Sequence, residues 1–238
     1  MSQKENSEVT AYSIYNVEQK KRTKINPLED IYPKLPEKKY QVIYADPPWD
    51  YGGKMQYDKT TIKDENVGFE KKIFLSSASF KYPTVKLKQL KELDVNSIAA
   101  DDCILFMWTT GPQMANSIEL GEAWGFEYKT VGFVWLKPKR AGDGYVLGMG
   151  YWTRSNVEIC LIATKGKPRR KSKTVSQLIF SPREKHSKKP DITRDLIVEL
   201  MGDLPRLEMF ARESTPGWDV WGNEVNSTVD ILNREDGS

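Results

Sequence analysis

The chain has 238 residues, with 36 lysine and arginine residues, 33 aspartate and glutamate residues and a formal net charge of +3. This length is compatible with one α/β domain, alone or with an appended arm, and allows a sizeable core. No apolar stretch approaches the roughly 20 residues that span a bilayer, and the polar N-terminus does not resemble a signal peptide. We therefore expect a soluble protein of the cytoplasm, or of the nucleus in a eukaryote, without a membrane partner.

The composition also argues against a disulfide and against a zinc site. Cys103 and Cys160 are the only cysteines, and each lies in an apolar, strand-like run where cysteine usually acts as a small buried apolar residue. His186 is the only histidine, so no set of ligands has zinc spacing. A histidine in a lysine-rich loop is more often solvated than functional. We expect no disulfide, no metal and no catalytic role for His186.

In chain order, residues 1–39 come first, and their polar, proline-containing sequence with few apolar periodicities indicates a partly disordered N-terminal arm. The main domain is expected over residues 40–226, followed by a polar tail over residues 227–238. Its first buried strand spans residues 41–45. Residues 50–79 show weak periodicity, and such long segments are usually functional or disordered.

Further along, the spacing of apolar residues predicts helices that alternate with strands. Leucines at helical spacing after Thr84 predict a helix over residues 85–93. Pro112 begins a second helix that Gly125 ends, and a third helix extends from Pro190 to Met201. Buried strands are expected over residues 103–108, 128–136, 157–163, 177–180 and 207–211. This alternation indicates an α/β fold with a mostly parallel sheet covered by helices on both faces.

The most informative local pattern is Asp46, Pro47, Pro48 and Trp49, directly after the first buried strand. The exocyclic amine of adenine or cytosine is a poor nucleophile, because its lone pair is delocalised into the ring. The Asp46 carboxylate and the Pro47 carbonyl can accept its two hydrogens, and the Pro-Pro pair holds that carbonyl still. Trp49 offers a flat face to a base removed from its stack, worth roughly 1–3 kcal/mol. The alternative is a rigid turn with Trp49 packed nearby.

The segment Tyr44-Ala45-Asp46-Pro47-Pro48-Trp49-Asp50 resembles the signature of the DPPW-type, or beta-class, adenine-N6 methyltransferases. This family includes the catalytic subunit of the eukaryotic mRNA adenosine methyltransferase, and the chain is most similar to its small bacterial and phage members. Further matches in the same order are Tyr82-Pro83-Thr84, Leu105-Phe106-Met107-Trp108, Trp135-Leu136-Lys137, Lys189-Pro190-Asp191, Phe210-Ala211-Arg212 and Gly222-Asn223-Glu224. The resemblance implies a Rossmann-like methyltransferase sheet with a permuted motif order, in which the catalytic strand precedes the cofactor strand.

The same resemblance implies S-adenosylmethionine as the cofactor. Asp46 and Pro47 would lie near the methyl donor, and the remaining contacts would come from Lys189, Arg212, Ser214, Asn223 and Glu224. Asparagine and glutamate suit ribose hydroxyls, whereas lysine or arginine suits the methionyl carboxylate. Ser214 and Glu224 replace a histidine and a glutamine of the mRNA enzyme, and the shorter Ser214 would need a water. Without these matches, Lys189 and Arg212 would be interpreted as ordinary surface ion-pair residues.

A basic tract over residues 165–173 contains six basic residues and no acid, which suits phosphate contacts. We expect nucleic acid to contact Lys165, Lys167, Arg169, Arg170, Lys171 and Lys173, in a patch extended by Lys137, Lys139 and Arg140. A solubilising surface run is the alternative, which the net charge of +3 does not decide. The glycine-containing segment 138–155 leads to a strand and not a helix, so we expect a mobile loop at the substrate cleft or at a homodimer or heterodimer interface.

These features predict an enzyme that flips an adenine out of DNA and methylates its exocyclic nitrogen. We expect DNA to be preferred to RNA, because the chain is compact and lacks the zinc modules and Arg-Gly-rich tails that RNA-directed relatives or their partners often carry. Three alternatives stay open: an RNA adenosine methyltransferase, a catalytically inactive nucleic-acid-binding partner subunit, and a methyltransferase acting on a protein or a free small molecule. The last leaves the basic tract unexplained.

Overall fold

A computed structural model describes residues 28–50, 57–63, 70–76, 84–139, 142–148, 150, 152–183 and 188–225. Within these ranges, no helix is both long enough and apolar enough to cross a membrane. Four of the expectations above concern residues outside the described ranges: the first 27 residues of the arm, Arg140, His186 and the C-terminal tail.

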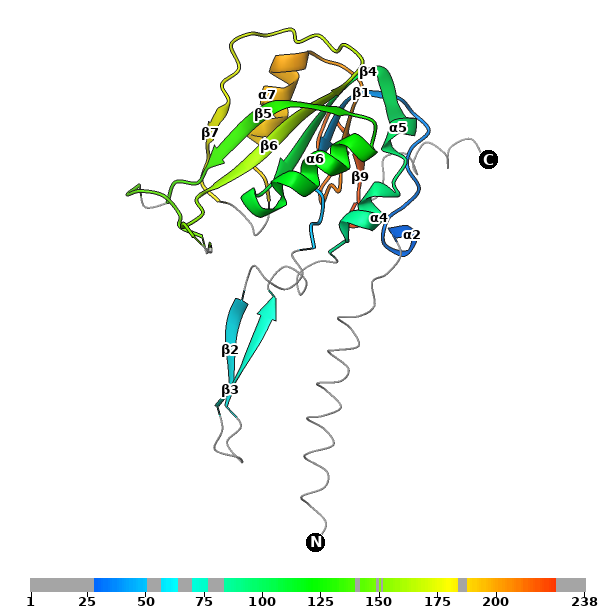
Figure 1. The fold of residues 1–238 in the computed structure, drawn as a ribbon. Helices are drawn as coiled ribbons and strands as arrows, with labels where there is room; N and C mark the ends of the chain where they lie inside the picture. The colour runs from blue at the N-terminus through cyan, green and yellow to red at the C-terminus, as the bar shows by residue number, and fades with distance from the viewer. Residues whose placement is uncertain are drawn as a thin grey trace.

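The core is a seven-stranded sheet with the strand order β7-β5-β6-β4-β1-β8-β9 (Figure 1). Its strands are β1 (Tyr40–Ala45), β4 (Ala99–Thr109), β5 (Glu127–Leu136), β6 (Val157–Lys165), β7 (Leu178–Phe180), β8 (Arg206–Met209) and β9 (Asp219–Trp221). Neighbouring strands pair in parallel except at β6, which is antiparallel to both β4 and β5. The predicted α/β class with a mostly parallel sheet is confirmed.

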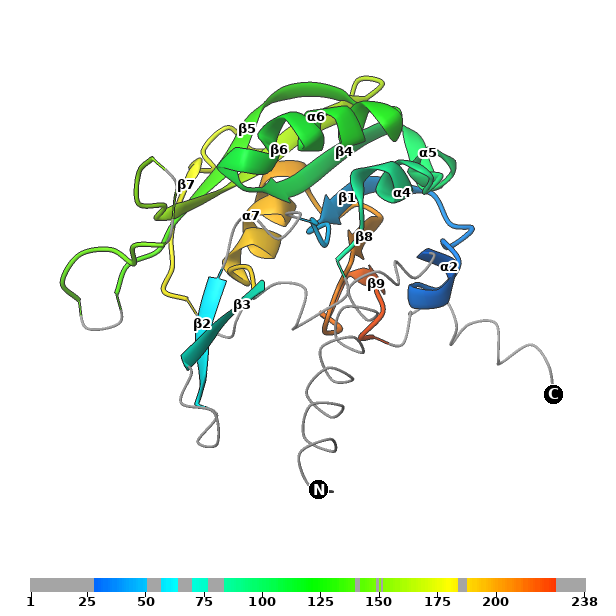
Figure 2. The same ribbon diagram turned by 60° about the horizontal axis from the view of Figure 1, so that its bottom comes forward.

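Helices cover both faces of this sheet. On one face lie α4 (Leu87–Lys91), α5 (Val95–Ile98) and α6 (Met114–Ala123), which follows the 3-10 turn η1 (Gly111–Gln113). On the other face lies α7 (Ile192–Met201), as Figure 2 shows. Leu90 and Leu120 belong to the apolar cluster of the first face, and Ile197 and Met201 to that of the second. Burial on both faces explains why the central strands are continuous apolar runs.

The observed elements differ from the predicted ones in four places. The helix expected over residues 85–93 is observed as the shorter α4, and a separate helix, α5, follows it, because the Asp94 carboxylate accepts a hydrogen bond from the Ser97 N–H and begins a new helix. Residues 50–79 contain an antiparallel pair, β2 (Tyr57–Lys63) and β3 (Glu70–Ser76). Strand β9 and helix α2 (Leu28–Ile31) have only three and four residues, too few for a periodicity to reveal.

The last part of the predicted arm packs against the core. Tyr32 is 7% exposed, and its ring stacks on Trp221 with 5.0 Å between the centroids. The Trp221 Nε1 donates a hydrogen bond to the Pro33 carbonyl at 3.0 Å. Because Trp221 belongs to β9, this segment covers the β8–β9 edge of the sheet. The packed region therefore begins before the boundary expected at Tyr40.

Candidate active site

Asp46 follows β1 at the carboxyl-end edge of the sheet, where open α/β sheets bind their ligands. Backbone hydrogen bonds fix the turn after it. The Trp49 N–H donates to the Pro47 carbonyl at 2.9 Å, and the Val85 N–H donates to the Pro48 carbonyl at 2.8 Å. A carbonyl oxygen has two lone pairs, so the Pro47 carbonyl can accept a further hydrogen bond. The turn thus presents a carboxylate and a fixed carbonyl at one place.

Trp49 is packed into the core. Its side chain is 5% exposed, and its Nε1 donates to the Trp108 carbonyl at 3.3 Å. A buried indole stiffens the turn but offers little ring surface to a flipped base. The stacking face expected of Trp49 is therefore not what the structure presents, and the packed-turn alternative describes this residue.

Lys189 lies directly against Asp46. Its Nζ is 2.6 Å from the Asp46 Oδ2 and 3.3 Å from the Glu158 Oε2. The Asp46 side chain is 29% exposed. Partial burial raises the Asp46 pKa, while the ammonium of Lys189 and, more weakly, the guanidinium of Arg212 act to lower it. Lys189 was expected at the cofactor together with Asp46, and the structure places the two side chains in contact.

Glu158 is a site residue that the sequence-based interpretation does not identify. It is the second residue of β6, and its carboxylate is bound by both Lys189 and Lys137. Burial acts to raise the Glu158 pKa, but the two lysines outweigh it and lower the pKa to about 2. Glu158 is therefore ionised at neutral pH. A single acid inside an otherwise apolar strand is the signal that could have revealed it.

Asp46, Lys189, Glu158 and Lys137 form a chain of alternating charges at the carboxyl-end edge. The Lys137 side chain is 14% exposed, and its Nζ lies 4.5 Å from the centroid of the Trp135 ring. Lys137 therefore belongs to the interior of this cluster, and not to an exposed patch of phosphate contacts as expected. Two cations balance two carboxylates, so both acids can stay charged although they are partly buried.

Strands β8 and β9 bring a second group of residues to the same edge. β8 pairs directly with β1, and the Ala211 N–H after β8 donates to the Trp221 carbonyl at 3.0 Å. Phe210 has φ 61°, a left-handed conformation that non-glycine residues adopt rarely and at an energetic cost. A Cβ at Gly222 would lie 2.0 Å from the Ala211 carbonyl oxygen. The two backbones thus meet too closely for any side chain at position 222.

Four side chains expected to contact the cofactor follow this close approach. All are exposed: Arg212, Ser214, Asn223 and Glu224. The Arg212 Nε lies 4.0 Å from the Glu224 Oε1. A guanidinium, a hydroxyl, an amide and a carboxylate on adjacent turns can pair with both the carboxylate and the hydroxyls of a ligand. This donor set fits a nucleoside cofactor that carries an amino acid.

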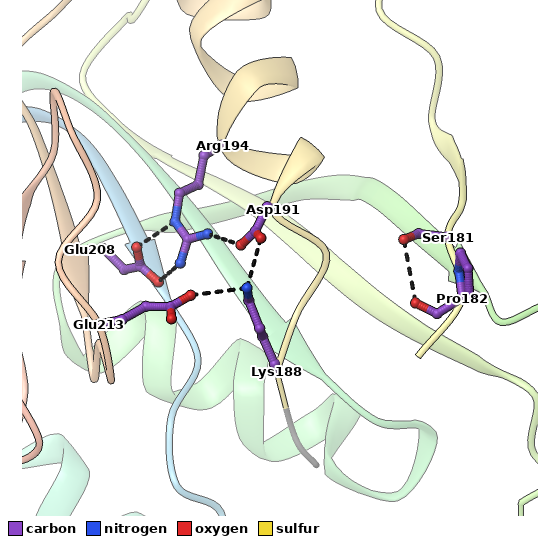
Figure 3. Close-up of polar contacts among 7 residues, drawn as sticks. All are labelled: Ser181, Pro182, Lys188, Asp191, Arg194, Glu208 and Glu213. Atoms are coloured by element: carbon purple, nitrogen blue, oxygen red, sulfur yellow. Dashed lines mark hydrogen bonds and ion pairs between the residues drawn. The ribbon is translucent and has the colours of Figure 1, made fainter. Parts of the chain in front are cut away.

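A buried ion pair supports β8 from the α7 side of the sheet. The Arg194 Nε and Nη2 bind the two carboxylate oxygens of Glu208 at 2.7 and 2.8 Å (Figure 3). Each of these two side chains is 11% exposed. The Arg194 Nη1 binds the Asp191 Oδ1 at 2.7 Å. The paired arginine thus fixes the beginning of α7 to the strand that leads to Arg212.

Comparison with known proteins identifies the family, since the MT-A70 family model matches residues 40–224. The chain belongs to the MT-A70 family. It is 60% identical over 221 residues to the Type II methyltransferase M.MunI from Mycoplasma sp, with 92% of each chain covered. It is 26% identical over 192 residues to the N(6)-adenosine-methyltransferase catalytic subunit METTL3 from Homo sapiens, where the match covers 79% of this chain and 28% of that protein. The predicted family and methyltransferase class are confirmed.

In this MT-A70 methyltransferase, the residues expected to contact nucleic acid lie at opposite ends of the strands of the sheet. Lys137 follows β5 beside the start of β6, since the Lys137 N–H donates to the Asn156 carbonyl. Lys165 ends β6, where its Nζ binds the Ala99 carbonyl at the start of β4. Eight residue steps of about 3.3 Å separate the two ends of β6, roughly 26 Å. The Lys171 N–H donates to the Leu200 carbonyl near the end of α7, so the basic tract stays at the end of the sheet that carries Lys165, away from Asp46.

This separation results from the direction of β6. In a wholly parallel sheet the residues after β6 would reach the edge that carries Asp46, but β6 is antiparallel to β4. The basic tract 165–173 and the pair Lys137 and Lys139 therefore do not form the single patch that was expected.

Proposed function

We propose that this MT-A70 methyltransferase transfers the methyl group of S-adenosylmethionine to the exocyclic amine of adenine in DNA. The observation that carries the proposal is the position of Asp46 at the end of β1, beside Lys189 and next to the strand that leads to Arg212. The relatives named N(6)-adenosine-methyltransferases support adenine as the base. DNA is supported by the 60% identity to a Type II methyltransferase, a designation of DNA-modifying enzymes.

In this proposal the chain holds the amine and shapes its nitrogen. Lys189 binds the Asp46 Oδ2, so we assign the Oδ1 as the acceptor for one amine hydrogen. The Pro47 carbonyl, fixed by the Trp49 N–H, accepts the other. Two acceptors draw the nitrogen towards tetrahedral geometry and localise its lone pair. S-adenosylmethionine supplies an electrophilic methyl group when bound, and correct placement of the amine contributes much of the acceleration.

The cofactor contacts in this proposal are Arg212, Ser214, Asn223 and Glu224, together with Pro47 and Asp46. Lys189 lies beside the proposed cofactor site, but the main role that we assign to it is to pair with Asp46. Pro48 keeps the turn rigid, because its carbonyl is bound by the Val85 N–H. Trp49 anchors the same turn in the core and is not assigned to the base.

The test is a methyl-transfer assay with labelled S-adenosylmethionine and duplex DNA, single-stranded DNA and RNA of matched sequence, followed by mass spectrometry of the nucleosides. We expect labelled N6-methyladenine in DNA. Asp46→Asn should lower turnover by about 100-fold or more, the scale seen when one aligned hydrogen-bonding group at a reacting centre is removed. Asp219→Asn is the matched control, because Asp219 pairs with Lys38 at the start of β9.

Each result decides a different part of the proposal. A clear excess of methylation on RNA would reassign the substrate and leave the chemistry standing. Near-wild-type turnover in a folded Asp46→Asn variant would refute the role of Asp46. Protein that binds nucleic acid but incorporates no label would indicate an inactive partner subunit.

A further inference from the structure

Lys188 has no role in the function proposed so far, although it lies between two parts of the site. Figure 3 shows that it contacts Asp191 and Glu213. Its Nζ is 2.7 Å from the Asp191 Oδ2 and 3.1 Å from the Glu213 Oε1. Glu213 stands between Arg212 and Ser214 on the turn after β8. Lys188 therefore connects the segment that precedes α7 to the turn that carries the proposed cofactor residues.

Asp191, which binds Lys188, is itself held in place by a second contact. The Asp191 carboxylate also accepts a hydrogen bond from Arg194, which is bound through two nitrogens to the buried Glu208. Burial acts to raise the Asp191 pKa, but the hydrogen bonds from Lys188 and Arg194 outweigh it and lower the pKa. An isolated surface ion pair contributes little, because ordering two long side chains offsets the attraction. Here the partner of Lys188 is already ordered, so that cost is smaller.

Lys189, the next residue, extends to the other part of the site. Its Nζ contacts the Asp46 Oδ2 and the Glu158 Oε2. Adjacent Cα atoms are about 3.8 Å apart, so a restraint on Lys188 also restrains the backbone of Lys189. The two neighbouring lysines thus hold one segment against both the catalytic strand β1 and the turn after β8.

We propose that Lys188 is a positioning residue. Through its contacts with Asp191 and Glu213, it keeps Lys189 against Asp46. The same contacts fix this segment relative to the turn that carries Arg212 and Ser214. This inference rests on the proposed function for its catalytic consequence. Its structural consequence, the ionisation of Asp46, can be measured without any turnover.

The pH behaviour of Asp46 follows from the groups that face it. Lys189 and Arg212 favour its ionised form, and Glu158 favours its protonated form. Asp46 also interacts electrostatically with Glu208 on β8 and with Cys160 on β6. An opposite charge within about 4–6 Å lowers a carboxyl pKa by 1–3 units. If Lys189 moves away, part of this effect is lost and the Asp46 pKa rises.

The experiment is a pH titration of the Asp46 side-chain carboxyl by carbon NMR, with the signal assigned from Asp46→Asn. Lys188→Met should raise the titration midpoint by about one pH unit, because the pairing with Lys189 is loosened. Lys188→Arg should restore it, and Glu213→Gln should give a smaller rise. Lys38→Met is the matched control, because it removes a lysine ion pair of 2.8 Å at the opposite edge of the sheet.

A kinetic arm uses single-turnover methyl transfer at saturating cofactor and DNA. We expect Lys188→Met to lower the rate by about tenfold and to shift the acid limb of its pH profile upward, while the Kd for S-adenosylmethionine changes less than threefold. A folded Lys188→Met variant with an unchanged Asp46 titration would overturn the inference. So would a loss confined to cofactor affinity. Failure of the wild-type protein to methylate would refute the proposed function, and the titration would still decide the role of Lys188.

Discussion

Replacing Arg194 with methionine should destabilise the protein strongly. Arg194 and Glu208 are each 11% exposed and share two hydrogen bonds of 2.7 and 2.8 Å. Methionine keeps much of the aliphatic volume but leaves the Glu208 carboxylate buried without its cation. Breaking a buried ion pair by removing one partner costs about 3–5 kcal/mol. We therefore expect the free energy of unfolding to fall by about that amount at neutral pH.

The loss should depend on pH in a defined direction. Burial raises the Glu208 pKa above its usual value in the wild type, although the hydrogen bonds and the charge of Arg194 act to lower it. In Arg194→Met the Glu208 pKa rises further, so the folded protein keeps a proton that the unfolded chain releases. The folded state then binds more protons than the unfolded state, and stability falls as the pH rises above the unfolded pKa. The deficit relative to wild type should be smaller near pH ~5 than near pH ~8.

Urea denaturation followed by circular dichroism measures these differences. The double variant Arg194→Met/Glu208→Met should regain most of the lost stability, because it leaves no buried charge. Lys129→Met is the control, since the Lys129–Glu127 pair is largely exposed and should contribute about 0–1 kcal/mol. If Arg194→Met loses no more stability than this control, or if the double variant is less stable than the single, the reasoning about the buried pair is wrong.

Two further predictions concern the cofactor edge and the basic tract. Gly222→Ala should lower the free energy of unfolding by about 1–3 kcal/mol, because its Cβ would lie 2.0 Å from the Ala211 carbonyl oxygen. It should also weaken S-adenosylmethionine binding in a titration. Gly111→Ala, with no atom within 4 Å of its Cβ, should do neither, and equal cofactor affinity in both variants would contradict the close-approach argument. Neutralising Lys167, Arg169, Arg170 and Lys171 together should weaken DNA binding and reduce its salt slope by up to about 0.9 per lost contact, without changing the rate at saturating DNA. An unchanged slope would assign the tract a solubilising role.

Features that depend on neighbouring residues could be predicted from the sequence. The apolar run before Asp46 predicts a buried strand, and β1 ends immediately before the aspartate. Gly125 was expected to end a helix, and it follows α6 with φ 86°, a conformation that glycine adopts without steric cost. The family resemblance also rests on local motifs, and the family match over residues 40–224 confirms it.

Which of these local features come into contact depends on the tertiary fold. Lys189 and Asp46 are 143 positions apart, and their contact depends on the placement of α7 against the sheet. Glu158 joins the site because β6 begins at the same edge, and the basic tract leaves it because β6 runs antiparallel to β4. Trp49 has the same sequence context whether its ring is free or packed, and only the surrounding core buries it. Local sequence patterns fix the period and ends of an element, whereas strand direction and charge pairing depend on contacts between residues far apart in the chain.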